Sequence, residues 1–295
     1  MNRIKIKDCP ICGHSSFIEV FKCKDNTVSG ELFQLVDCAN CKFRFTNPRP
    51  ADEHLSDYYK SDTYISHSDT NEGLTNKIYK RVRDFNLKIK YKLVKKFLNI
   101  SDPILLDVGA GTGYFVNFCN KNGMQADGFE PDADARKVAK NTHGFSLIDN
   151  WEKINKKYDV ITMWHVLEHV PDLKIQLEKL KQILKPQGVL IIAVPNRESL
   201  DEKHYKSDWA AYDVPRHLYH FRKSDLIRLA SDFNMKFLDD KPMWFDAPYV
   251  SILSEKHKES NLATVKGTIF GTISNVASIF TNQQSSKIYI FRNEK

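Results

Sequence analysis

The chain has 295 residues, of which 41% are hydrophobic and 27% are charged, a composition typical of a soluble globular protein. The first residues are charged and lack an apolar core, and no apolar run is long and clean enough to cross a bilayer. We therefore expect a cytoplasmic protein with neither a secretory signal nor a transmembrane helix. The formal net charge of +7 comes from one stretch, because residues 77–99 hold nine Lys or Arg and one Asp.

Two Cys-x-x-Cys pairs lie near the N-terminus, Cys9 with Cys12 and Cys38 with Cys41. Each pair can sit on a tight turn that directs both thiolates at one ion, and the segment between the pairs alternates like short strands. Disulfides are disfavoured without a secretion signal. We predict a zinc ribbon over residues 1–47, in which four sulfur ligands leave no open position for catalysis.

A Pro-bearing linker and one helix are predicted over residues 48–100. Apolar residues recur there at helical spacing. They are Ile78, Val82, Phe85, Ile89, Leu93 and Phe97. The pattern predicts an amphipathic helix that buries these side chains, and it favours a solvated basic face over a surface for an anionic partner such as RNA.

Strand and helix patterns alternate from residue 101 onwards. The predicted strands cover residues 104–108, 125–129, 145–148, 158–164 and 188–194, with two strand-like segments near 241–245 and at the C-terminus. The predicted helices cover residues 114–122, 132–141, 172–184 and 224–233. This alternation predicts an α/β fold with a doubly wound, mostly parallel sheet, in which ligands bind beyond the carboxyl ends of the strands.

The first predicted strand ends in a loop with glycines at alternate positions, Gly109, Gly111 and Gly113, preceded by Asp107. A dinucleotide-binding loop needs a glycine at position 114, which is a Tyr, and no Lys-Ser or Lys-Thr pair follows as in a P-loop. Glu130 ends the second strand, where a carboxylate can accept hydrogen bonds from both hydroxyls of a ribose.

This loop resembles motif I of the class I S-adenosylmethionine (SAM) methyltransferases, and Leu-Glu-His-Val-Pro-Asp at 167–172 resembles the quinone methyltransferases of that class. The ribbon resembles the N-terminal part of bacterial sugar C-methyltransferases. The resemblance implies a seven-stranded Rossmann-like sheet over residues 101–295, with SAM as the cofactor. It places the cofactor against Asp107, Gly109, Ala110, Gly111, Gly113, Glu130, Pro131, Asp149, Asn150, Trp164 and His165.

The acceptor is expected under a substrate cap formed by residues 195–223. The chain lacks the motif that follows the fourth strand in methyltransferases of nucleobase amino groups. We therefore expect an oxygen or carbon acceptor in a small molecule or in a glycan or lipid precursor. The candidates for the base are His217, His220 and Tyr59. We favour His217, because a histidine ordinarily titrates near pH ~6.5 and the neighbouring Arg216 disfavours a second positive charge.

Alternative functions remain open in the sequence. The ribbon and the basic helix could belong to an RNA-binding rRNA or tRNA methyltransferase, or the fold could be a non-catalytic SAM-binding adaptor. His165, Glu168 and His169 could converge on a second metal if they lay on one helix. An insertion at 247–283 carries an apolar stretch, 262–280, which we expect to form a lid over the acceptor in preference to a weak membrane contact.

Overall fold

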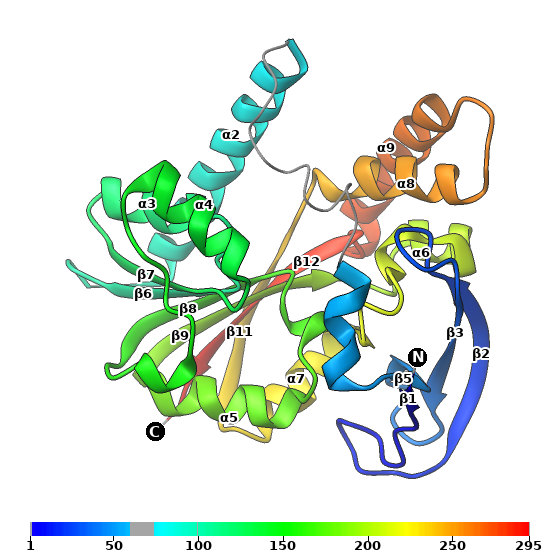
Figure 1. The fold of residues 1–295 in the computed structure, drawn as a ribbon, viewed down its shortest axis with the longest axis horizontal. Coiled ribbons are helices and arrows are strands. Elements are labelled where there is room, and N and C mark those ends of the chain that lie inside the picture. Colours follow the sequence, from blue (N-terminus) through cyan, green and yellow to red (C-terminus); the bar gives the residue numbers. More distant parts are fainter. Residues whose placement is uncertain (1, 60–73, 99, 295) are drawn as a thin grey trace.

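The structure is a computed structural model that describes residues 2–59, 74–98 and 100–294. A large α/β unit lies beside a smaller β-rich unit built from the N-terminal residues (Figure 1). The helix α2 (Leu74–Lys96) connects the two in sequence and packs on the α/β unit.

The central sheet has six strands among the described residues, in the order β11–β12–β9–β8–β6–β7. These strands are β6 (Ile104–Val108), β7 (Gln125–Phe129), β8 (Tyr158–Trp164), β9 (Leu184–Pro195), β11 (Met235–Pro242) and β12 (Ser286–Asn293). Strands β6 to β9 are parallel, and β12 runs antiparallel to β9 and β11. The strand predicted at 145–148 is reduced to one parallel bridge between Ile148 and Phe129, in the place of a seventh strand. The mostly parallel Rossmann-like sheet predicted from the sequence is thus confirmed.

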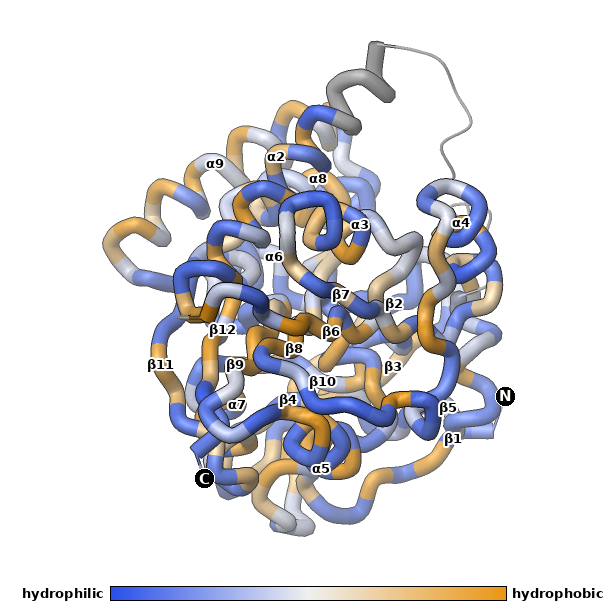
Figure 2. The backbone as a smooth tube through the Cα atoms, turned by 90° about the vertical axis from the view of Figure 1, so that its left-hand side faces the viewer, coloured by the Kyte–Doolittle hydropathy of each residue, from blue (hydrophilic) through white to orange (hydrophobic). Residues whose placement is uncertain are grey.

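Helices cover both faces of this sheet. They are α2, α3 (Tyr114–Lys121) and α4 (Ala133–His143) on one face, and α5 (Leu173–Ile183) and α7 (Lys223–Ser231) on the other (Figure 1). Successive strand residues point to opposite faces, so Leu105 packs with α2 and α3 whereas Leu106 packs with α5 and α7. The inner strands are mainly apolar because both of their faces are buried (Figure 2).

The predicted buried face of α2 is wrong at three positions. Val82, Phe85 and Ile89 are exposed, whereas Leu87 and Val94 are buried against the sheet. The first half of α2 extends beyond the sheet in Figure 1, so the helix has no sheet to pack against at Val82 and Phe85, whereas the exposure of Ile89 shows that the helix turns this residue away from the sheet. Ile78 lies outside the residues whose side chains the structure describes.

The N-terminal unit and the predicted cap share one sheet. Its strands are β2 (Phe17–Lys24), β3 (Leu32–Cys38), β4 (Arg44–Thr46) and β10 (Tyr219–His220), in the order β10–β4–β3–β2, while β1 (Arg3–Ile4) pairs with β5 (Arg49–Pro50). The remaining elements around the cap are η1 (Asp52–Tyr59), α6 (Leu200–Tyr205), η4 (Lys206–Asp208) and η5 (Ala210–Tyr212). The boundary predicted at residue 47 therefore divides segments that pack together.

The insertion at 247–283 forms a helical hairpin of α8 (Asp246–His257) and α9 (Ala263–Thr281). The backbones approach closely, because a Cβ on Gly267 would lie 2.4 Å from the Cα of Ile252, and one on Gly271 would lie 2.4 Å from the Cα of Pro248. None of the helices in the described ranges combines the length and the apolar character needed to cross a membrane.

Candidate active site

The glycine loop after β6 owes its conformation to three positive φ angles, 72° at Gly109, 53° at Gly111 and 77° at Gly113. The amides of Gly109 and Ala110 both donate to the Phe129 carbonyl, at 2.8 and 3.0 Å, which ties the loop to β7. A Cβ on Gly109 would lie 2.4 Å from Cγ2 of Val166, whereas one on Gly111 would meet no atom within 4 Å. Gly111 is therefore the position where bare backbone faces open space.

Glu130 lies beside this loop at the end of β7. Its Oε2 accepts from the Gly111 amide at 2.7 Å, and its Oε1 accepts from the Asp132 amide at 3.0 Å. Burial raises the pKa of Glu130 above its usual value. Gly128 was missed in the sequence, although a glycine inside a strand signals a close approach. A Cβ there would lie 2.8 Å from the Cβ of Ala110, so a side chain would displace the loop.

Asp107 ends β6 almost fully buried, and its Oδ1 accepts from Oγ1 of Thr162 at 2.6 Å. Burial raises the pKa of Asp107 to about 7, against the opposing effects of the Thr162 hydrogen bond and the Lys90 charge. Lys90 was assigned to a solvated face, but its Nζ lies 4.4 Å from the ring centre of Trp164, and burial lowers its pKa. The basic face of α2 thus contributes one cation to the site.

The remaining predicted cofactor residues make structural contacts. Asp149 is exposed and forms an ion pair with Lys153 at 2.7 Å. The Asn150 side chain accepts from the Glu152 amide and caps the short helix η2 (Trp151–Lys153). Pro131 precedes Asp132, the N-cap of α4. These contacts leave their cofactor roles as predictions.

His165 follows β8 with a φ of 56°, an uncommon value for a residue with a Cβ. Its Nδ1 donates to Oε1 of Glu168 at 3.2 Å, and its Nε2 donates to Oδ2 of Asp246 at 3.1 Å. Although burial opposes a charge, these two carboxylates raise the pKa of His165 to about 10. Both ring nitrogens are therefore occupied by carboxylates, which leaves no lone pair to accept a proton or to bind a metal ion in this arrangement. Asp246, the first residue of α8, had no signal in the sequence that linked it to this site.

Two of the three predicted catalytic residues meet at one cluster, although they are far apart in sequence. The Tyr59 hydroxyl lies 2.9 Å from Nδ1 of His169, whose ring centre is 4.5 Å from that of His217. His169 belongs to η3 (Leu167–His169), directly after β8. Burial and the neighbouring His217 lower the pKa of His169 to about 4, so its ring is neutral at pH 7. Nδ1 of His217 donates to the Ala211 carbonyl at 2.9 Å, so Nε2 is the ring nitrogen left for another partner.

The structure lends no support to the electrostatic reason for favouring His217. The guanidinium of Arg216 is buried against two carboxylates, 3.2 Å from Asp25 and 2.5 Å from Asp213, and it also donates to the Tyr58 carbonyl. Its charge is therefore neutralised within the protein, and Oδ2 of Asp213 lies 3.9 Å from Nε2 of His217. Support for His217 as a base comes instead from the place of its ring beside His169 and from Nδ1, whose bond to the Ala211 carbonyl orients Nε2.

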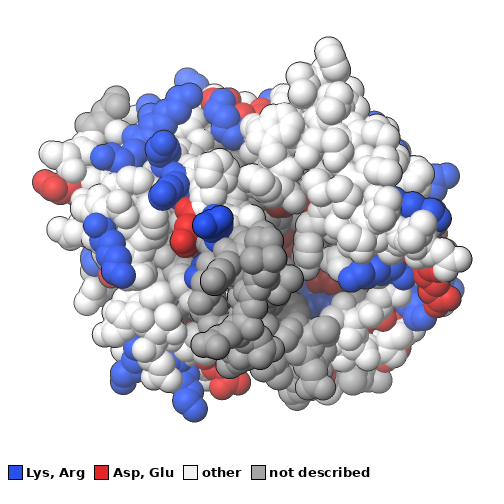
Figure 3. Space-filling view, turned by 90° about the horizontal axis from the view of Figure 1, so that it is seen from above, with Lys and Arg blue, Asp and Glu red and all other residues white. Residues whose placement is uncertain are grey.

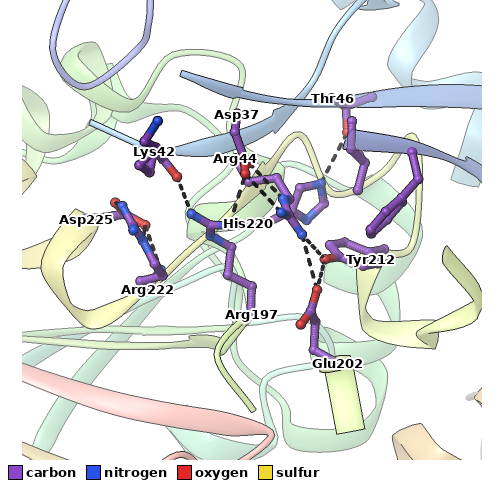
Figure 4. Close-up of polar contacts among 12 residues, drawn as sticks. Asp37, Lys42, Arg44, Thr46, Arg197, Glu202, Tyr212, His220, Arg222 and Asp225 are labelled. Atoms are coloured by element: carbon purple, nitrogen blue, oxygen red, sulfur yellow. Dashed lines mark hydrogen bonds and ion pairs between the residues drawn. The ribbon is translucent and has the colours of Figure 1, made fainter. Parts of the chain in front are cut away.

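His220 lies in the interface between the N-terminal unit and the cap (Figure 4). Its Nε2 is 3.4 Å from Oγ1 of Thr46, and burial holds its pKa well below the usual value, so the ring is neutral. Beside it, Arg44 pairs with Asp37 at 2.8 Å and donates to the Tyr212 hydroxyl at 2.7 Å. These contacts give His220 an anchoring role, and its catalytic role stays a prediction.

The four cysteines of the ribbon come together in space. Their sulfur atoms lie within 4.8 Å of one another, with 3.6 Å between Cys9 and Cys41 and 3.5 Å between Cys12 and Cys38. A tetrahedral zinc with Zn–S bonds of ~2.3 Å requires sulfur separations of about 3.8 Å. The cluster therefore fits a structural zinc ion.

A family model described as a methyltransferase domain matches residues 77–239, from within α2 to β11. The chain belongs to this family, the class I SAM-dependent methyltransferases. The ubiquinone biosynthesis O-methyltransferase of Hydrogenovibrio crunogenus is 27% identical over 119 residues, which cover 37% of this chain and 49% of that protein. The tRNA U34 carboxymethyltransferase of Ruthia magnifica is 31% identical over 113 residues, which cover 35% of this chain and 36% of that protein.

Among solved structures, magnesium protoporphyrin IX methyltransferase from Synechocystis with bound S-adenosylhomocysteine (SAH) superimposes with a TM-score of 0.54. It is 12% identical, and the match covers 83% of this chain and 100% of that one. This likeness shows the fold. The chain spans about half or less of the length of the two curated relatives named above.

Proposed function

We propose that this protein transfers the methyl group of SAM to an oxygen or carbon atom of a small molecule or of a glycan or lipid precursor. The main support is the arrangement at the carboxyl edge of the sheet, where Gly111 faces open space beside the buried carboxylates of Asp107 and Glu130. The Glu130 oxygens that now accept from amides are suited to accept from ribose hydroxyls. An ionised Asp107 is suited to face the ammonium group of the cofactor.

The protein needs to contribute little covalent chemistry to this reaction. SAM carries its methyl on a cationic sulfur, so the protein must align the acceptor with that methyl and exclude water. Such positioning supplies roughly 7–11 kcal/mol. His217 is our candidate for the residue that takes the acceptor's proton, a contribution of roughly 10²–10⁴-fold. The Tyr59 hydroxyl contacts His169, and the His169 ring packs against His217, so both side chains would line the acceptor pocket beside it.

The surroundings of Asp246 support an acceptor with an apolar part. Trp244 and Phe245 precede it, and their side chains are 42% and 46% exposed. Phe85 of α2, 53% exposed, meets Phe245 with 5.9 Å between ring centres. These exposed aromatic rings connect α2 with the start of α8, whose Asp246 bonds to His165. A quinone-like or lipid-linked molecule would cover them, and we favour it over RNA.

The outer face of α9 supports a weak membrane contact more directly than the lid we expected. A stripe of its apolar residues is more than half exposed: Leu262, Val265, Ile269, Ile273, Val276, Ile279 and Phe280. This surface lies on the same side of the molecule as the basic side chains of α2 (Figure 3). Apolar burial combined with basic residues favours binding to an anionic membrane surface.

A vesicle flotation assay tests this contact. The protein should float with vesicles of phosphatidylcholine and phosphatidylglycerol, whereas an Ile273→Glu variant should not. If the unchanged protein does not float, the result favours a lid over the acceptor instead.

We also propose that Cys9, Cys12, Cys38 and Cys41 hold one structural zinc, supported by the geometry of their sulfur atoms. When bound, this ion stabilises the ribbon, and no acceptor or water can reach its filled coordination shell.

The decisive experiment follows labelled methyl groups. The protein and SAM with a labelled methyl are incubated with metabolite, lipid and RNA extracts, and SAH affinity is measured by calorimetry. Label in a small molecule or lipid supports the proposal. Label in RNA would instead identify an RNA methyltransferase. SAH binding without transfer to any extract would favour the non-catalytic adaptor.

A further inference from the structure

A second cluster of ligand atoms lies outside the ribbon. Glu168, His169 and His217 each place one carboxylate oxygen or ring nitrogen within 4.8 Å of the others. Glu168 is fully buried, and its Oε2 has no hydrogen-bond partner among the described residues. A buried carboxylate oxygen without a partner is costly, because its lost hydration is not replaced. Although His165 donates to Oε1, Oε2 therefore lacks a donating or positively charged partner among the described residues.

Both histidines present an unprotonated nitrogen. Nδ1 of His169 lies 3.1 Å from the Arg216 carbonyl, and Nδ1 of His217 lies 2.9 Å from the Ala211 carbonyl. A carbonyl only accepts, so we assign the proton to each Nδ1, which His169 also directs at the Tyr59 hydroxyl at 2.9 Å, and a lone pair to each Nε2 of the neutral rings. Metal-binding histidines commonly donate their other ring nitrogen to a backbone carbonyl in this way, which fixes the tautomer and the ring orientation.

The surroundings hold the three side chains in place. His165 donates to Oε1 of Glu168 at 3.2 Å, which leaves Oε2 to face the cluster. On the cap side, Arg216 pairs with Asp25 and Asp213, which fixes the segment that leads to His217. These are the outer contacts expected of ligands that are oriented before an ion binds.

We propose that Glu168, His169 and His217 bind a divalent transition-metal ion. One carboxylate and two imidazoles suit Zn²⁺, Fe²⁺, Co²⁺ or Mn²⁺ and leave coordination positions open. An oxygen atom of the acceptor would fill an open position, and this role rests on the proposed methyl transfer. His217 would then hold the ion through Nε2 and would not itself take the proton.

The ligand set differs from the one suggested by sequence spacing. His165, Glu168 and His169 were expected to converge along one helix, but the segment forms a single 3₁₀ turn preceded by a residue with positive φ. Both ring nitrogens of His165 donate hydrogen bonds to carboxylates, and the third ligand comes instead from His217 in the cap. The fold rather than the local spacing brings the set together.

The test uses the full, tag-free protein with its ribbon loaded with zinc, and Co²⁺ as the probe. Calorimetry and visible absorption should show one Co²⁺ per chain beyond the ribbon, without the intense charge-transfer band of cobalt bound to thiolates. Glu168→Gln and His217→Asn should each weaken Co²⁺ binding at least tenfold. The exposed His14, changed to Gln, serves as the control and should leave the affinity unchanged.

SAH affinity is measured on the same samples, so loss of folding is recognised and failure of cofactor binding is recorded separately. If Glu168→Gln fails to fold, His169→Gln replaces it beside His217→Asn. Absence of Co²⁺ binding in the unchanged protein would overturn the proposal. Equal Co²⁺ affinity in the folded variants would do the same, and would leave His217 as a metal-independent proton acceptor.

Discussion

The proposed cofactor side and the proposed acceptor side of the site are assembled in different ways. The cofactor side depends mainly on one short stretch, from Asp107 to Glu130, in which backbone amides and glycines do most of the shaping. The acceptor side draws Tyr59, His169 and His217 from three segments that lie far apart in the chain. A local pattern therefore encodes the first, and the topology of the whole fold encodes the second.

The ribbon belongs to the acceptor side of this comparison. Asp25, between β2 and β3, forms an ion pair with Arg216. Oγ1 of Thr46 donates to the His217 carbonyl at 3.0 Å, and the Thr46 amide donates to the Leu218 carbonyl at 3.0 Å. The segment that carries His217 is thus held by the ribbon, and ribbon stability should control acceptor binding.

Removing a ribbon cysteine should have the largest effect. Cys38→Ala should abolish zinc binding and unfold the ribbon, because structural zinc contributes an apparent ~10–16 kcal/mol to folding in small zinc domains. We expect hydrogen exchange of residues 213–220 to accelerate to the level of an unfolded segment, while SAH still binds. Elemental analysis, exchange mass spectrometry and calorimetry measure the three quantities.

Cys23 provides the matched control for this change. It is as buried as Cys9 but lies outside the sulfur cluster, so Cys23→Ala should retain zinc and protection of residues 213–220. Unchanged protection of that segment after zinc loss would show that the acceptor side stands without the ribbon.

The second-largest effect is expected for Gly111→Val, which should reduce the affinity for SAH at least ~100-fold. The new side chain would occupy the open space beside the loop, which we assign to the cofactor. Gly123→Val is the control, because Gly123 also has a positive φ and also has no atom within 4 Å of a built Cβ. Similar backbone strain should leave its SAH affinity intact, and a parallel loss in both variants would mean that strain, not filled space, weakens binding.

The comparison also explains what the sequence could predict. Glycine spacing and strand–helix alternation identified the sheet and the methyltransferase family, both of which are confirmed. These features depend on residues that are close together in the chain, so their spacing can be read directly from the sequence. Gly128 was within reach of the same reasoning, since a glycine inside a strand needs an explanation.

The acceptor side was beyond that reasoning. The bond from His165 to Asp246 and the meeting of His169 with His217 depend on the register of distant segments, which no local period records. The same limit applies to α2, where a helical period predicted a buried stripe but the end of the sheet decided which residues were covered. The assignments of individual cofactor and catalytic residues stay predictions.

His217→Asn should lower turnover by roughly 100-fold or more, with SAH affinity unchanged. The reason is the loss of the Nε2 lone pair at the acceptor side, whether it takes a proton or holds an ion. His204→Asn is the control, because this ring stacks on Phe270 of α9. The rates are compared with the acceptor found in the labelling screen, and near-normal turnover from pH 6 to 9 would remove His217 from the reaction.

The affinity for SAM should rise about tenfold between pH 6 and pH 8. Burial raises the pKa of Asp107 to about 7 in the protein without cofactor, so about one chain in ten carries the carboxylate at pH 6 and about nine in ten at pH 8. Only the ionised form attracts the cofactor's ammonium group. Calorimetry at several pH values should show this rise, and an Asp107→Asn variant should bind weakly with a much flatter pH profile.

The last expected effect concerns stability without cofactor. Asp107 has a pKa of about 7 when folded, against ~3.9 in an unfolded chain, so the folded state binds the extra proton between these values. Its contribution to stability is therefore lost as pH rises from about 4 to about 7. Asp107→Asn should have a melting temperature near that of the unchanged protein at pH 4 and a higher one at pH 8, by roughly 10 °C, since this difference in pKa corresponds to ~4 kcal/mol and about 1 kcal/mol shifts a domain of this size by ~2–4 °C. A difference in melting temperature that does not change with pH would show that Asp107 is already ionised when folded, and the predicted rise in SAM affinity would then lose its basis.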